Sequence, residues 1–238
     1  MGASVSTYQS YVQLLKTRLF WSVFLLVLIH FSGAIGMVYF DTDLFASMTP
    51  YNLGLMFLLL IFNEQFLGKY FVTAFVLAFL SGLVTELIGI NTGMLFGNYS
   101  YGDVLGLKVY GVPIIIGINW FTIVYCAYIS AGKLLGWIYK GNFKYEASSF
   151  SYHILQAVFT AILTTAFDWL MEPIAVRLGF WSWKGDEIPL FNYTCWFSVS
   201  LLLSLGFSRL KLSIKNSFSF VLLAVQSAFF IFLRIFLH

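Results

Sequence analysis

Three carboxylic acids in apolar surroundings, Glu86, Asp168 and Glu172, are the residues of this chain best suited to proton transfer. A poorly solvated site raises the pKa of a carboxyl group, so it can stay protonated near neutral pH and act as a donor. A second carboxylate can accept a proton. Because placing an acid at the centre of a bilayer costs about 2.5–3.5 kcal/mol, such residues usually face a protein interior or a wet cavity. We therefore treat all three as candidate catalytic residues.

The segment around the first acid is repeated around the second. Residues 86–101 align without a gap on residues 168–183, and each copy places a glycine eleven residues after its acid. An aromatic-Ser-aromatic triplet follows, residues 99–101 in one copy and residues 181–183 in the other. After a loop that is six residues shorter in the second copy, the match resumes at Val112-Pro113 with Ile188-Pro189 and at Trp120-Phe121 with Trp196-Phe197.

Glu172 belongs to the second copy alone. It lies four residues after Asp168, which places both acids on one face of a helix. Pro173 follows it and disfavours helical geometry at the preceding residue, so we expect Glu172 to lie at a helix break. By contrast, Glu64 stands in a short segment beside Lys69 and is interpreted as a loop residue.

Aromatic and amide side chains near the acids are candidate ligand-binding residues. Trp and Tyr favour membrane interfaces as anchors, but their faces also suit a flat or isoprenoid ligand and stabilise a cation. Buried amides need partners, and could orient an acid or a water molecule or cap a helix. The candidate set comprises Asn91, Tyr99, Tyr101, Asn119, Trp120, Trp181, Trp183, Asn192 and Trp196.

Composition predicts an all-α polytopic membrane protein. The chain is 60% hydrophobic and 10% charged, against about 25% charged in soluble domains. About seven transmembrane helices of about 20 residues are expected, the second being short and either starting earlier, near Leu44, or lying tilted or at the interface. All belong to one integral membrane domain, residues 1–238. The spans are residues 19–40, 51–63, 70–90, 112–138, 150–171, 190–207 and 217–237.

The repeat unit is a helix, a motif loop and a helix, so spans 3–4 and 5–6 form parallel repeats, about residues 70–138 and 150–207. Both motif loops then reach one membrane face, and Glu86 and Asp168 should meet in one shared pocket. Lysines and arginines favour a cytoplasmic N-terminus, with motif loops outside the cell (inner) membrane. On the N-terminal side stand Lys16, Arg18, Lys69, Lys133, Lys140, Lys144, Arg209, Lys211 and Lys215, against Lys108, Arg177, Lys184 and Arg234 opposite.

Several classes of function are disfavoured by the sequence. A formal net charge of +3 is too small and too scattered to indicate a nucleic-acid partner. Cys126 and Cys195 lie in apolar runs without metal-ligand spacing, so we expect buried core residues and no metal site. The last span lacks the Schiff-base lysine of a retinal protein, and no aspartate-rich cluster for a diphosphate is present.

Four strings carry a resemblance: TELIGINTGMLFGNYSY, GVPIIIGINW, FDWLMEPIAVRLGFWSW and IPLFNYTCW. In this order they resemble the polytopic carotenoid biosynthesis protein family, which includes γ-carotene hydratase and bisanhydrobacterioruberin hydratase. The resemblance covers about residues 70–200. It implies addition of water to the terminal alkene of an acyclic (ψ) carotenoid end group, with no redox cofactor. A γ-carotene- or lycopene-like polyene, water and membrane lipid are the implied partners, and other carotenoid pathway enzymes are candidate partners.

The acids fit this implied chemistry. Protonation at the less substituted alkene carbon gives a tertiary carbocation, which water captures while a carboxylate accepts the released proton. Asp168 or Glu86 could be the acid, the other acid or Glu172 the base, and Asn91, Asn119 or Asn192 could position the water. An isomerase or cyclase would use the same carbocation. A transporter or lipid-binding protein that uses the acids for proton coupling is the alternative from another class, and would need a polar path to both faces.

Overall fold

A computed structural model describes residues 2–139, 150–185, 187–210 and 212–237. Three of the cationic residues used to predict the orientation, Lys140, Lys144 and Lys211, lie outside these ranges. The helices are α1 (Gly2–Tyr39), α2 (Thr42–Ser47), α3 (Thr49–Phe62), α4 (Lys69–Thr92), α5 (Ile115–Ile138), α7 (Phe150–Arg177), α8 (Leu190–Ser208) and α9 (Ser217–Phe236). The strands are β1 (Tyr99–Tyr101), β2 (Lys108–Val109), β3 (Val112–Pro113) and β4 (Trp181–Trp183).

The helices confirm the predicted class of an all-α polytopic membrane protein. Six of them are long and apolar enough to cross a membrane: α4, α5, α7, α8, α9 and residues 13–39 of α1. The predicted short second span is the 14-residue helix α3. The preceding helix α2 begins near the expected alternative start at Leu44, and Met48 separates the two helices.

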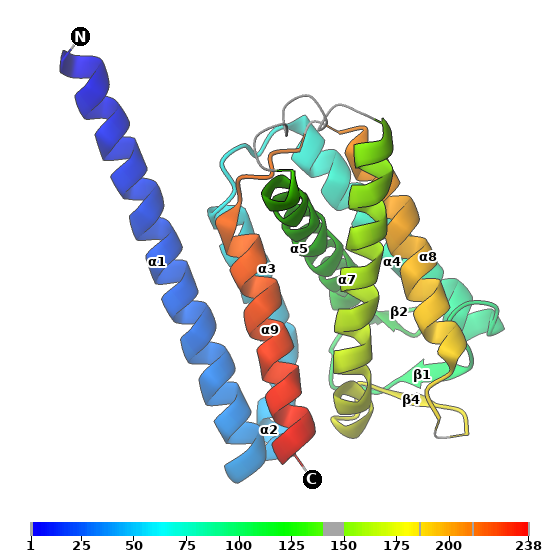
Figure 1. The fold of residues 1–238 in the computed structure, drawn as a ribbon. Helices are drawn as coiled ribbons and strands as arrows, with labels where there is room; N and C mark the ends of the chain where they lie inside the picture. Colours follow the sequence, from blue (N-terminus) through cyan, green and yellow to red (C-terminus); the bar gives the residue numbers. More distant parts are fainter. Residues whose placement is uncertain (1, 140–149, 186, 211, 238) are drawn as a thin grey trace.

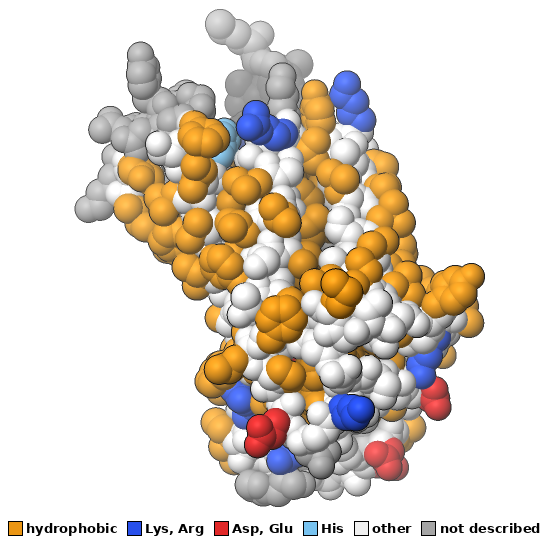
Figure 2. Space-filling view, turned by 90° about the vertical axis from the view of Figure 1, so that its right-hand side faces the viewer, with side chains coloured by type: hydrophobic (Ala, Val, Ile, Leu, Met, Phe, Trp, Pro, Cys, Tyr) orange, Lys and Arg blue, Asp and Glu red, His pale blue; other side chains and the backbone are white. Residues whose placement is uncertain are grey.

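The surface agrees with this class. In the view of Figure 2, hydrophobic side chains cover the length of the helices, and the charged side chains gather toward the two ends of the molecule. A chain in water would leave these apolar faces unfavourably hydrated, whereas lipid tails match them. The N-terminus lies at one end of the bundle, and the C-terminus lies at the end that carries the strands (Figure 1).

The two aromatic triplets pair directly with each other. Strands β1 and β4 form an antiparallel ladder in which Ser100 faces Ser182, while Tyr99 faces Trp183 and Tyr101 faces Trp181. Figure 1 shows this ladder at the end of the bundle, where α4 and α7 end. An antiparallel pair centred on equivalent serines relates the two copies by a local two-fold axis. Both motif loops therefore lie at one end, as the parallel repeat predicted.

The repeated glycines have a backbone reason. Gly97 has a φ of 125° and Gly179 a φ of 69°, conformations that residues with a Cβ atom rarely adopt. Each glycine precedes its aromatic triplet and turns the chain out of the loop toward the ladder. The two turns differ in geometry, but both use a positive φ that favours glycine at the repeated position.

The expectation of a helix break at Glu172 is wrong. Helix α7 continues through Pro173 to Arg177. A proline within a helix lacks the N–H that would bond the carbonyl four residues earlier, but neighbouring membrane helices and side chains allow a helix to continue past it. Glu172 is therefore held on the rigid face of α7, one turn beyond Asp168.

Helix α5 is the most enclosed of the long helices and packs against α4, α7 and α9. Its Trp120 is completely buried and lies against Gly82 of α4, where a Cβ atom would stand 2.5 Å from the Trp120 Cγ atom. The absence of a side chain at Gly82 therefore lets the indole of Trp120 occupy its place between the helices.

Replacing Gly82 by alanine should destabilise the protein by about 1–3 kcal/mol, because overpacking forces neighbouring side chains to move. Gly54→Ala on α3 is the matched control, since a Cβ atom there meets nothing within 4 Å. Thermal unfolding of both variants in detergent measures the difference. A Gly82→Ala protein as stable as Gly54→Ala would contradict the tight packing of Trp120.

Candidate active site

The three acids line one small cavity between the two copies. Glu86 comes from α4, whereas Asp168 and Glu172 come from α7, and their exposed fractions are 5%, 1% and 2%. The cavity has a volume of about 20 Å³, enough for about one water molecule. The shared pocket expected from the repeat is therefore present.

Glu86 is surrounded by hydrogen-bond donors. Its Oε2 atom accepts from the hydroxyl groups of Tyr99 and, at 2.7 Å, of Tyr101. Its Oε1 atom accepts from Nε1 of Trp120 at 3.0 Å. Burial and the neighbouring Glu86 raise the pKa of both tyrosine hydroxyls, so these remain protonated donors. Since three donors point at one carboxyl group, the arrangement suits a carboxylate.

Glu172 has the equivalent environment in the second copy. Its Oε2 atom accepts from Nε1 of Trp181 at 2.8 Å and of Trp183 at 3.4 Å. The Nδ2 atom of Asn192 approaches Oε1 at 3.3 Å. An indole N–H can only donate, so Glu172 must accept these bonds. Each aromatic triplet thus holds one acid, Tyr99 and Tyr101 holding Glu86 while Trp181 and Trp183 hold Glu172.

Asp168 differs from the other two acids in having an oxygen without a partner. Its Oδ2 atom accepts from Nδ2 of Asn192 at 2.8 Å. Its Oδ1 atom is buried and has no hydrogen-bond partner among the described residues. Asn192 therefore bridges Asp168 and Glu172 through one amide group, and Asp168 keeps a free oxygen at the cavity.

Two equivalent tryptophans complete the local two-fold arrangement. The rings of Trp120 and Trp196 stack with their centroids 3.9 Å apart and their planes at 10°. Both rings line the acid cavity. They form a stacked aromatic pair beside the acids, and the outer face of such a ring attracts a positive charge.

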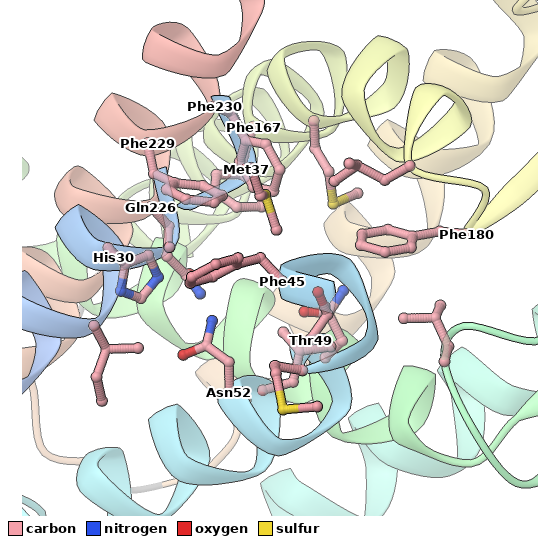
Figure 3. A pocket seen from close by; sticks show the side chains of 18 of the residues that line it. His30, Met37, Phe45, Thr49, Asn52, Phe167, Phe180, Gln226, Phe229 and Phe230 are labelled. Atoms are coloured by element: carbon pink, nitrogen blue, oxygen red, sulfur yellow. The ribbon is translucent and has the colours of Figure 1, made fainter. Parts of the chain in front are cut away.

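A larger, mainly apolar cavity adjoins the acids. It has a volume of about 240 Å³ and extends between α1, α3, α7 and α9 (Figure 3). Its lining includes phenylalanines from three helices, Phe45 of α2, Phe167 of α7 and Phe229 of α9. It shares four lining residues with the acid cavity, Ile116, Asn119, Met171 and Trp181. An apolar ligand in the larger cavity would thus lie against the wall that carries the acids.

The structure brings together every candidate site residue except Asn91. The others all line the acid cavity. The exposed side chain of Asn91 instead donates from Nδ2 to the carbonyl of Leu87 at 2.8 Å, within its own helix. Sequence reasoning missed Phe96, Ile116 and Met171, which also line the cavity. These ordinary apolar residues carry no signal that would separate them from the rest of the core.

Glu64 and the cysteines lie elsewhere. Glu64 is buried, which the loop interpretation did not anticipate. Its Oε2 atom accepts from the hydroxyl of Tyr125 at 2.5 Å and from Nδ2 of Asn216 at 3.1 Å. It thus joins the end of α3 to α5 and to the start of α9. Cys126 and Cys195 are both buried and unpaired, as expected for core residues.

These features define a polytopic membrane protein with a buried acidic site beside an apolar cavity. The chain belongs to the carotenoid biosynthesis protein family, whose model matches residues 46–237. It is also 33% identical over 132 residues to the bisanhydrobacterioruberin hydratase of Haloarcula japonica. That match covers 52% of this chain and 41% of the relative, so the chain spans less than half of the curated protein that it matches. No solved structure is significantly similar to the chain.

Proposed function

We propose that this protein adds water to the terminal 1,2 double bond of an acyclic (ψ) carotenoid end group and produces a tertiary alcohol. The observation that carries the proposal is the meeting of Glu86, Asp168 and Glu172 at a water-sized cavity beside a larger apolar one. Membership of the carotenoid biosynthesis family supports a polyene as the ligand. The similar protein named a hydratase supports the type of reaction.

Asp168 is the proton donor in this proposal. Glu86 and Glu172 each accept from three donor groups, an arrangement that favours the ionised form of both carboxyls. The Oδ1 atom of Asp168 has no such partner. A proton on this oxygen can therefore pass to the less substituted alkene carbon, and the positive charge develops on the tertiary carbon.

Glu172 is the proposed base, and the aromatic groups stabilise the cation. Water attacks the tertiary carbon, and Glu172 accepts the proton that this water releases. The reaction consumes one alkene and one water and forms one alcohol. The next turnover needs the proton returned to Asp168, which lies one helical turn away and shares Asn192 with Glu172. The stacked Trp120 and Trp196 rings and the Glu86 carboxylate favour the positive charge.

The acid cavity lies near the end of the bundle that carries the ladder of β1 and β4. With the N-terminus in the cytoplasm, this end faces outward from the cell membrane, and the polyene enters from the lipid. We propose this orientation from the distribution of Lys and Arg. No redox cofactor takes part in the proposed reaction.

Expression in a host that makes γ-carotene or lycopene tests the proposal. The expected result is a new pigment whose mass exceeds that of its precursor by one water and whose end group is a tertiary alcohol. A cyclised or isomerised pigment of unchanged mass would show that the protein is an isomerase or cyclase and would refute hydration. An unchanged pigment profile in both hosts, with the protein present in the membrane, would refute the assignment of substrate.

Proton-coupled transport receives less support from the cavities. A third cavity of about 110 Å³ lies around Glu64 and Tyr125, and none of its described lining residues also lines the other two. Among these three cavities, the large apolar cavity and the acid cavity adjoin each other. Their common wall consists of Ile116, Asn119, Met171 and Trp181. This arrangement is closer to an apolar ligand cavity that ends at the acids than to a transport path. A transport path would need polar groups between the two membrane faces.

A further inference from the structure

The large cavity contains a polar group that the proposed hydration does not use. His30 of α1, Asn52 of α3 and Gln226 of α9 all line it. Figure 3 shows the three side chains together on one side of the cavity, away from Phe180, which precedes Trp181 at the acid site. Three polar side chains from three separate helices meet in surroundings that are otherwise mainly apolar.

The hydrogen-bonding capacity of this group is largely unused. The Nδ1 atom of His30 lies 2.9 Å from the carbonyl of Leu26 and must donate to it, which leaves Nε2 of a neutral imidazole as an acceptor. The Oδ1 atom of Asn52 is buried and has no hydrogen-bond partner among the described residues. Gln226 is 7% exposed. Within the part of the chain that the structure describes, its amide forms no hydrogen bond.

Unmet polar atoms indicate what the cavity should bind. A buried polar atom left without a partner costs about 1–3 kcal/mol. A hydroxyl group can donate to His30 or Asn52 and accept from the amide of Gln226. A carbonyl oxygen can only accept, and a hydrocarbon can do neither. The group therefore matches an alcohol better than a ketone, and a ketone better than a plain hydrocarbon.

We propose that His30, Asn52 and Gln226 bind a hydroxyl group already present on the isoprenoid substrate. This inference rests on the proposed hydration, and it narrows the substrate class from a plain hydrocarbon to an oxygenated polyene. Such a substrate must come from a preceding reaction that places a hydroxyl group on the chain.

The size and position of the cavity support one ligand that reaches both sites. An apolar cavity of about 150 Å³ holds a benzene molecule, so about 240 Å³ has room for a branched isoprenoid end. Its wall beside Trp181 reaches the acids, and its opposite side carries the polar group. A hydroxyl held by the polar group would fix how far the reacting alkene extends toward Asp168.

A series of substrates tests this inference. Membranes containing the protein are supplied with one acyclic polyene hydrocarbon and with derivatives of it that carry a single hydroxyl at different distances from the terminal alkene. Wild type should hydrate at least one alcohol with a kcat/KM about tenfold or more above that of the hydrocarbon. Gln226→Leu and Asn52→Leu should each move this ratio toward one.

The ratio is measured within one sample, so a smaller amount of folded protein does not change it. Ser227→Ala is the matched control, because Ser227 is next to Gln226, does not line the cavity and bonds the carbonyl of Leu223 at 2.8 Å. It should retain the wild-type ratio. Equal hydration of the hydrocarbon and of every alcohol by wild type would show that the polar group holds only water and would overturn the inference. Absence of any hydrated product would instead overturn the proposed function on which it rests.

Discussion

Replacing Asp168 by asparagine should reduce hydration by about 10²- to 10⁴-fold, the usual contribution of a positioned general acid, while the protein stays folded. An asparagine amide has no proton acidic enough to protonate an alkene. Its oxygen can still accept from Asn192 at the present Oδ2 position. Its amide nitrogen then replaces Oδ1, which has no partner to lose. The substitution therefore removes the chemistry without breaking a contact.

Pigment analysis in a polyene-producing host, corrected for the amount of membrane protein, measures this effect. Asp103→Asn makes the same chemical change at an exposed acid outside both cavities, where Asp103 pairs with Lys108 at 2.7 Å. It should convert substrate like wild type. If Asp168→Asn also converted substrate at the wild-type rate, Asp168 could not be the proton donor.

The architecture of the site could be predicted because the sequence repeats unusual residues rather than apolar ones. The parallel repeat placed both motif loops at one end of the bundle, and the ladder of β1 with β4 confirms this placement. The Trp120 and Trp196 correspondence became a stacked pair. Equivalent positions that lie close to the axis of two copies face each other across it, so the repeat could indicate this part of the site.

The partners of each acid could not be predicted in the same way. The alignment pairs Glu86 with Asp168, yet the residue that receives the aromatic N–H donors in the second copy is Glu172. The aligned position in the first copy is Ile90, so the two copies place their aromatic-bonded acids one helical turn apart. A tyrosine hydroxyl and an indole N–H extend to different points from similar backbone positions, and only coordinates resolve which acid each one reaches.

The large cavity was also beyond sequence reasoning. Much of its wall comes from α1, α3 and α9, which lie outside the repeat. Hydropathy does not separate a phenylalanine that lines a cavity from one that faces lipid. In the sequence, His30 is a lone histidine in an apolar run and gives no sign of a binding role. Its role in a polar group depends on Asn52 and Gln226, which are distant in sequence and meet only through helix packing.

Glu172→Gln should reduce hydration about 10²-fold or more. The reason is that every hydrogen-bond partner of Glu172 donates to it. The glutamine oxygen can face Trp181 and Trp183, but its NH₂ group then faces the NH₂ group of Asn192. If Asn192 keeps its orientation, two donors oppose each other, at a cost of about 1–3 kcal/mol in stability. If the Asn192 amide rotates, its oxygen faces Asp168 and holds the proton that should reach the alkene. In either orientation of Asn192, the variant also lacks the carboxylate that accepts the proton from water.

Glu86→Gln separates this effect from a general loss of negative charge. Its amide oxygen can face Trp120, and its NH₂ group can donate to Tyr99 and Tyr101, because a hydroxyl group can turn and accept. We therefore expect Glu86→Gln to unfold at nearly the wild-type temperature and to lose activity only through weaker stabilisation of the cation. Thermal unfolding in detergent, combined with pigment analysis of both variants, provides the comparison. A Glu172→Gln protein with full conversion would exclude Glu172 as the base and leave Glu86 as the remaining carboxylate that could accept the proton from water.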